Sequence, residues 1–202
     1  MVNIEEGRIR TVFENFMLEH AIDFYDKTKD AENEKDETKY CAGVIIFSWT
    51  FLEGYINCFI NHQLHGFIND LKPVDFRGLS TIQKYSFLLK MIDGEPFIRG
   101  SEPLESFILL NKIRNRLIHF EGKSESVWKD EPPKKLVKQC EQKFMVKDIR
   151  TSSLRRILTT ECAKWSQLTV RDIIEYFEKR TYKRDMNILR KKKGSDSLKS
   201  LD

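Results

Sequence analysis

The longest apolar stretch of the chain, residues 39–67, constrains the fold most strongly. A helix drawn through it carries apolar side chains on nearly every side, which is typical of a helix buried in the middle of a bundle. The 202 residues include only nine Gly and five Pro and show no sustained alternation of apolar and polar residues, so strands are not expected. We therefore predict an all-α fold, a helical bundle of four to six helices.

Turn signals divide the chain into helical segments. Ser80 or Thr81 fits the start of one helix, Ser101 fits the start of another, and Gly122 fits a helix stop. Helices are expected over residues 8–25, 39–67, 81–92, 101–120 and 136–145, with at least one more within 153–182. Because 202 residues with 14 Phe can bury a sizeable core, residues 1–182 are interpreted as a single helical domain.

Charge is distributed unevenly along the chain. Residues 26–38 are nearly all polar and are interpreted as a charged connection, either exposed or a helix extension in water. Residues 179–202 carry nine Lys and Arg against three Asp, a net charge of +6, whereas the whole chain carries +4. Residues 183–202 are therefore expected to be a basic, disordered tail, which is either a solvated terminus or a surface for a phosphate backbone. The lysines expected to make such contacts are Lys191, Lys192 and Lys193.

The four cysteines show no C-x-x-C pairing and no histidine at zinc-finger spacing. They are interpreted as buried, reduced thiols, and no metal or cofactor is expected. The first ten residues lack the apolar core of a signal peptide. The apolar run 41–52 is shorter than the roughly 20 residues that span a bilayer. We therefore expect a cytoplasmic protein without a membrane span.

Residues 111–122, which read N-K-I-R-N-R-L-I-H-F-E-G, hold the strongest functional signal. A helical wheel through this region gives one apolar arc toward the core, formed by Leu109, Leu110, Ile113, Leu117 and Phe120. Asn111, Asn115 and His119 lie four residues apart and share a different face. The sequence thus predicts a polar column, ending in His119, that points away from the core.

An arginine, an amide and a histidine near one helix end are suited to phosphate chemistry, since they supply a fixed cation, a hydrogen-bonding amide and a group that titrates near neutrality. Arg114 lies at the edge of the polar column, about 140° around an ideal helix from His119. The long arginine side chain would have to reach across that angle. Arg116, three residues before His119, is an alternative for the same role.

The string from Arg114 to His119, R-N-x-x-x-H, resembles the R-x(4-6)-H signature of HEPN-domain ribonucleases, in which a polar residue, often Asn, follows the arginine. The apolar helix S-W-T-F-L-E-G-Y-I-N, with Glu53 in it, also resembles that family. The resemblance covers residues 39–122. It implies a bundle of four or five helices that forms a homodimer, with the two motifs facing each other across a cleft.

The same resemblance implies a metal-independent endoribonuclease, of the kind found in toxin–antitoxin pairs, phage defence or RNA processing. An antitoxin or another protein partner is then expected. Relatives that have lost the motif act only as binding or assembly modules, whereas this chain keeps both Arg114 and His119.

The chemistry of the residues leads to RNA by a separate route. His62 and His65 have a spacing that a metal could use, but the sequence offers no third ligand beside them and no other convincing cluster. A phosphodiester is therefore expected to be cut without a metal to activate water. RNA carries its own nucleophile, the 2′-OH, and DNA does not. His119 suits proton transfer, and Arg114 suits the charge that develops on the phosphorane. The expected products are a 2′,3′-cyclic phosphate and a 5′-OH.

Structural roles remain as alternatives for each of these residues. His119 could interact with carbonyls at a helix end, and Arg114 and Arg116 could pair with nearby surface carboxylates. Glu53 either supports the site by positioning Arg114 or His119, or belongs to a buried structural pair. For the whole protein, the alternative is a non-catalytic HEPN-like helical module that binds a protein or a nucleic acid.

Overall fold

The computed structural model describes the backbone of residues 3–5, 8–10, 12–64, 72–118, 134–146 and 154–198, and the side chains of these ranges from residue 15 to residue 181. The described residues form an all-α bundle, as predicted. Its helices are α1 (Val12–Lys29), α2 (Glu34–His62), α4 (Thr81–Asp93), α5 (Leu104–Ile118), α6 (Lys134–Glu141) and α7 (Thr160–Leu198). Two short 3-10 helices, η1 (Pro73–Phe76) and η2 (Leu154–Arg156), lie between them in the chain.

A small hairpin precedes α1, where the sequence analysis expected helix from residue 8. Strands β1 (Asn3–Glu5) and β2 (Arg8–Arg10) pair in antiparallel fashion, with Ile4 opposite Ile9. The helix begins only at Val12. Strands of three residues are too short to produce the alternation by which a strand is detected in a sequence, so the hairpin was missed.

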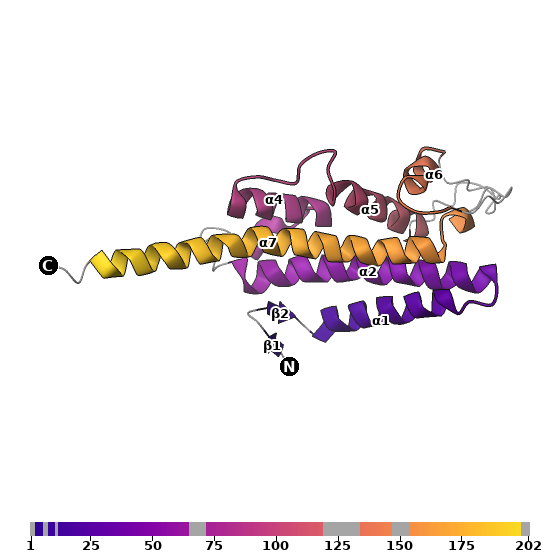
Figure 1. The fold of residues 1–202 in the computed structure, drawn as a ribbon, viewed down its shortest axis with the longest axis horizontal. Helices are drawn as coiled ribbons and strands as arrows, with labels where there is room; N and C mark the ends of the chain where they lie inside the picture. The colour runs from indigo at the N-terminus through magenta and orange to yellow at the C-terminus, as the bar shows by residue number, and fades with distance from the viewer. Residues whose placement is uncertain are drawn as a thin grey trace.

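Figure 1 shows α2 and α7 side by side along the length of the molecule, with α1 against one side of this pair and α4 and α5 on the other. Helix α6 lies beside the end of α5. Helix α2 is therefore covered from several directions. Its side chains Val44, Ile45, Leu52 and Ile56 have no exposed surface, as the apolar pattern of residues 39–67 predicted.

Helix α2 is long and apolar enough to cross a membrane by length and composition alone. However, 61% of its most apolar 18-residue segment is buried inside the bundle. A helix in the core of a bundle passes the same test, so packing against the other helices accounts for its composition.

The predicted charged connection 26–38 is mostly helical. Helix α1 continues to Lys29 and α2 begins at Glu34. The signal for this early start is Asn33, whose side chain accepts a hydrogen bond from the backbone N–H of Asp36 at 3.0 Å. Such a cap satisfies a free N–H group of the first turn, and the acidic residues there favour the positive end of the helix.

The start of α4 was predicted correctly. Ser80 is the N-cap, and its hydroxyl and the Gln83 side chain form a reciprocal capping box. The helix ends at Gly94, whose φ of 87° lies in the left-handed region that glycine adopts at least cost.

Helix α7 continues to Leu198, where the sequence analysis expected a disordered tail from residue 183. Residues 183–198 contain four Lys and two Arg, which have high helix propensity. Because it extends a helix that is already docked on the bundle, it does not bear the cost of nucleation. Figure 1 shows this part of α7 running beyond the other helices.

Helices α1 and α2 approach closely at Gly43. A Cβ added at Gly43 would lie 2.4 Å from Cδ1 of the Phe24 ring, closer than any ordinary carbon contact. The ring itself is held between Tyr40 and Phe47, with centroids 6.1 Å and 5.4 Å away. Glycine at this position therefore allows α1 to lie flat against α2.

Replacing Gly43 by alanine is expected to lower the free energy of unfolding. The overpacking costs about 1–3 kcal/mol and outweighs the gain of roughly 1 kcal/mol in helix propensity. Urea unfolding followed by circular dichroism measures the difference.

The matched test is the double variant Gly43→Ala with Phe24→Leu, in which the smaller side chain makes room for the methyl group. The loss caused by Gly43→Ala should be smaller in the Phe24→Leu background than in the natural chain. If Gly43→Ala stabilises the protein, then helix propensity dominates and the close contact is not a constraint.

Candidate functional site

The inner face of α5 is formed by the predicted apolar arc, except for Phe120, which lies outside the described residues. Leu109, Leu110 and Ile113 are buried, and Leu117 packs against the same core. Phe107, one turn before Leu110, contacts Trp49 of α2 with ring centroids 5.4 Å apart. These contacts fix the rotation of α5, so its polar residues are held on the outer side.

Arg114 and Asn115 are both half-buried on this outer side and are joined by a hydrogen bond. Arg114 Nη1 donates to Asn115 Oδ1 at 2.9 Å. Neighbouring residues of a helix do not normally face each other, and it is the length of the arginine that lets it fold back to the amide. The bond leaves the amide N–H₂ of Asn115 and further guanidinium N–H groups as donors. Two adjacent donor groups of this kind suit an anionic oxygen such as that of a phosphate.

The remaining motif residues lie around this pair. Asn111 and Arg116 are half-buried, and Ile118, the last residue of α5, is exposed. His119 directly follows Ile118 in the sequence and lies outside the described residues, as does Gly122. The amide of Asn115 is bonded to Arg114 rather than to Arg116, so Arg114 is the arginine whose position the motif itself fixes.

Glu53 does not lie beside Arg114. Helices α2 and α5 run in opposite directions (Figure 1), and the contact between Trp49 and Phe107 sets their register. Glu53 is one turn beyond Trp49 toward the start of α5, whereas Arg114 is two turns beyond Phe107 the other way. At 1.5 Å per residue, this separates them by about 16 Å along the helix axis. The half-buried carboxylate of Glu53 is thus too far away to orient Arg114, because its side chain cannot span that distance.

Several polar residues of α2 take part in packing. Thr50 donates to the carbonyl of Ile46 at 2.9 Å, and Lys84 of α4 donates to Asn57 Oδ1 at 2.8 Å. Asn61 is exposed near the end of the helix. Asn57 thus joins α2 to α4.

Two polar residues missed by the sequence analysis connect α2 to α7. Tyr55 donates its hydroxyl to Glu178 Oε1 at 2.8 Å, and both side chains are buried. The residues are 123 positions apart, so no local spacing could have revealed the pair. It gives a buried carboxylate a hydrogen-bond donor, without which burial would be costly.

Arg180 was counted with the basic end of the chain, yet it is a structural residue. Its guanidinium donates to the carboxylate of Asp93, to the carbonyls of Glu95 and Pro96, and to the hydroxyl of Tyr176. These bonds fasten the segment between α4 and α5 to α7. They therefore help to fix where α5 begins.

All four cysteines are buried and free, as predicted: Cys41, Cys58, Cys140 and Cys162. Burial raises the pKa of the Cys140 thiol to about 12, and it raises the pKa of Cys162 as well. Thiols of this kind are not the nucleophiles of a reactive site at neutral pH. Among the residues that the structure describes, no three or more His, Cys, Asp or Glu side chains converge as metal ligands.

The lysines expected to contact phosphates, Lys191, Lys192 and Lys193, lie on the helical backbone of α7 beyond the bundle, and their side chains are outside the described part. They are far along the chain from the α5 site. Comparisons with protein-family models, curated proteins and solved structures found no match. The HEPN resemblance therefore depends on the motif and the helical setting alone.

Replacing Arg180 by alanine is expected to lower the free energy of unfolding by about 2 kcal/mol, because several hydrogen bonds to a mostly buried guanidinium are lost. The control is Arg171→Ala on the same helix. That side chain is 59% exposed and, among the described residues, pairs with Asp172 and Glu175 of α7, so the change should stay within roughly 0.5 kcal/mol. If chemical denaturation shows equal losses in the free energy of unfolding for the two variants, then Arg180 does not have this structural role.

Proposed function

We propose that this protein is a metal-independent endoribonuclease whose site lies at the C-terminal end of α5. The observation that carries the proposal is the hydrogen bond between Arg114 and Asn115 on the outer side of a helix whose inner face is firmly packed. A guanidinium held by its neighbour is a preorganised cation, and preorganised charge is the main source of transition-state stabilisation in such reactions.

The reaction would use the 2′-OH of the RNA as nucleophile. His119 would move a proton at the 2′-oxygen or at the leaving 5′-oxygen, while Arg114 and the amide N–H₂ of Asn115 bind the oxygens of the phosphorane. The bond between phosphorus and the 5′-oxygen breaks as the bond to the 2′-oxygen forms. The products are a 2′,3′-cyclic phosphate and a 5′-OH.

A second proton-transfer group is needed, and we propose that His119 of a second copy supplies it. The other histidines of the chain are His20, His62 and His65. Of these, His20 is packed between the rings of Phe16 and Phe47, and His62 is exposed at the end of α2. A homodimer with facing motifs is the economical arrangement. The partner proposed for control of the activity is an antitoxin or another protein that covers the site.

A second candidate function is a non-catalytic module that binds RNA through α7. The observation that favours it is the extension of α7 beyond the bundle, in a segment that carries most of the excess positive charge. An extended basic helix can follow a phosphate backbone without reading its sequence. According to this interpretation, the bundle supports α7 and catalyses no reaction.

The first proposal predicts RNA cleavage in excess EDTA, with a terminal 2′,3′-cyclic phosphate. His119→Ala should reduce the cleavage rate by about 10²-fold or more, as expected for the loss of a proton-transfer group. Arg114→Ala should reduce it by a comparable factor through the loss of charge stabilisation. Gel analysis of end-labelled RNA measures the rates and the chemistry of the ends.

Two matched controls separate the site from a general loss of charge. Arg99→Ala removes an exposed arginine between α4 and α5, and His62→Ala removes an exposed histidine from α2; neither should change the rate. Cleavage that is equal in all variants, or absent from the natural chain, would rule out an enzyme that uses Arg114 and His119.

The second candidate predicts an effect of α7 on RNA affinity. Exchange of Lys191, Lys192 and Lys193 for glutamine should weaken binding of single-stranded RNA and reduce the salt slope of log K by about 2, at roughly 0.7 per lost phosphate contact. The control is the same exchange of three exposed lysines of α6: Lys134, Lys135 and Lys138. Unchanged affinity and slope in fluorescence anisotropy would show that α7 does not hold the RNA.

A further inference from the structure

Positive charge is concentrated on the second half of α5 and on α6. Residues 111–118 carry one Lys and two Arg with no Asp or Glu, and residues 134–143 carry four Lys against one Glu. These two segments together have a net charge of +6, whereas the whole chain has +4. Residues 179–202 carry a further +6, so the rest of the chain is acidic. The surroundings of Arg114 and Asn115 are therefore a basic part of an otherwise acidic bundle.

Two contacts set the direction of α6 relative to α5. Lys112 Nζ donates to Gln139 Oε1 at 3.1 Å. Lys143, which follows α6, pairs with Glu102, which precedes α5. The chain of α6 therefore runs back toward the start of α5, and its first turn lies on the side of the α5 C-terminal end, where the proposed site is. Figure 1 shows α6 beside that end of α5.

The packing of α6 turns its lysines outward. Leu136, Val137 and Cys140 are buried on one side of the helix. The other side carries three exposed lysines: Lys134, Lys135 and Lys138. Within the described part of the chain, none of these three forms an ion pair. Their charges are thus available to an anionic ligand.

Lys112 connects these lysines to the proposed site. It is exposed and lies three residues before Asn115, so the two side chains are neighbours on the surface of α5. Its partner Gln139 is an uncharged amide, which leaves the positive charge of Lys112 without compensation from that contact. We call the area formed by Lys112 and the three exposed lysines of α6 the α5–α6 surface. It continues the row of donors that begins with Arg114 and Asn115.

The composition of the α5–α6 surface indicates how it would hold a nucleic acid. Residues 111–118 and 134–143 contain no aromatic side chain, and aromatic side chains are what proteins use to stack on bases. Lysine binds a phosphate as a point charge, and phosphate contacts carry no sequence information directly. Binding here would therefore be independent of the base sequence and would weaken with added salt.

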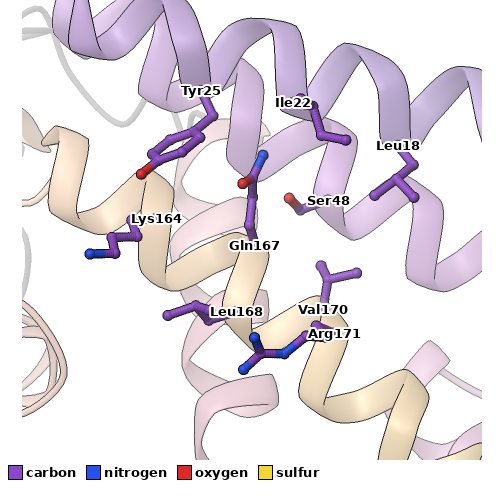
Figure 2. Close-up of a pocket in the computed structure, with 9 residues that line it drawn as sticks. All are labelled: Leu18, Ile22, Tyr25, Ser48, Lys164, Gln167, Leu168, Val170 and Arg171. Atoms are coloured by element: carbon purple, nitrogen blue, oxygen red, sulfur yellow. The ribbon is translucent and has the colours of Figure 1, made fainter.

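The opposite side of the bundle offers no comparable surface among the described residues. A pocket between α1, α2 and α7 has apolar walls that include Ile22 and Leu168 (Figure 2). The side chain of Gln167 crosses this pocket and donates to the carbonyl of Ala21 at 3.0 Å. A phosphate placed there would lose its hydration against apolar walls.

We propose that the α5–α6 surface holds the phosphate backbone of the RNA substrate next to the cleaved bond, without selecting its bases. The inference rests on the proposed ribonuclease site, since Arg114 and Asn115 bind the phosphate that is cut. The lysines of the α5–α6 surface bind the neighbouring phosphates on one side of it. A dinucleotide contains only the phosphate that is cut, so the surface favours a longer RNA strand.

The first experiment measures affinity in the His119→Ala background, in which the RNA remains intact. Exchange of Lys134, Lys135 and Lys138 for glutamine should weaken binding of an RNA octamer on the order of tenfold at low salt. The salt slope of log K should fall by about 2, at roughly 0.7 per lost phosphate contact. The loss should be the same for octamers of uridine and of cytidine. Fluorescence anisotropy measures both quantities, and a loss confined to one octamer would contradict sequence-independent binding.

The matched control removes the same amount of charge elsewhere on the bundle. Lys27 of α1 and Lys35 and Lys39 of α2 are exposed, and their exchange for glutamine should change the affinity by less than about twofold. If the two triple exchanges weaken binding equally, then long-range charge explains the effect and the inference is wrong. The inference is also wrong if binding weakens only on exchange of residues 191–193, because α7 then holds the RNA.

The second experiment compares cleavage of the octamer with cleavage of a dinucleotide. The natural chain should cleave the octamer with a kcat/KM at least about tenfold higher. Exchange of the three α6 lysines should remove most of this advantage through KM rather than kcat, because the backbone contacts are the same in the ground state and the transition state. An advantage that survives the exchange would overturn the inference.

The two proposals fail in different ways. If the natural chain cleaves RNA with the expected ends, and the α6 exchange changes neither affinity nor length preference, then the ribonuclease stands and the α5–α6 surface does not bind its substrate. If no RNA is cleaved but the α6 exchange still weakens binding, then the surface is supported and the proposed chemistry is wrong.

Discussion

The burial of α2 on most of its surface is the constraint on which the rest of the structure depends. A helix whose apolar side chains point in nearly all directions must be surrounded, because any exposed side would leave apolar area in water. Phe51 and Ile60, for example, are both buried and lie about 180° apart around an ideal helix axis. The other helices pack buried apolar side chains against α2 and against each other.

The hydrophobic effect itself has no preferred direction, and polar contacts add a defined geometry to the apolar packing. Polar contacts with α2 do so at intervals along its length. Glu37, near its start, accepts hydrogen bonds from the backbone and hydroxyl of Thr160, the first residue of α7. Tyr55, further along, binds Glu178, and Asn57 accepts from Lys84 of α4. Each of these groups has a defined geometry, so together they align α4 and α7 with the central helix.

Local patterns in the sequence predicted the parts of the fold that depend on local physics. The capping residue Ser80, the apolar arc around Ile113 and the burial of α2 are all set by residues three or four positions apart. What the sequence could not give depends on residues distant in the chain. The partner of Tyr55 and the role of Arg180 are decided by which helix lies opposite, and the short hairpin before Val12 has too few residues to show a period.

In the candidate site, too, the sequence predicts what depends on local helical spacing and not the side-chain contacts. The outward position of Arg114 and Asn115 follows from helical spacing, and the bond between them adds a detail that spacing does not contain, because it depends on how a long side chain folds back. For Glu53 the sequence left both a role in the site and a structural role open, and spacing along one helix cannot decide between them. A motif on one helix says nothing about the register of a second helix, and the Trp49 contact places Glu53 toward the other end of α5.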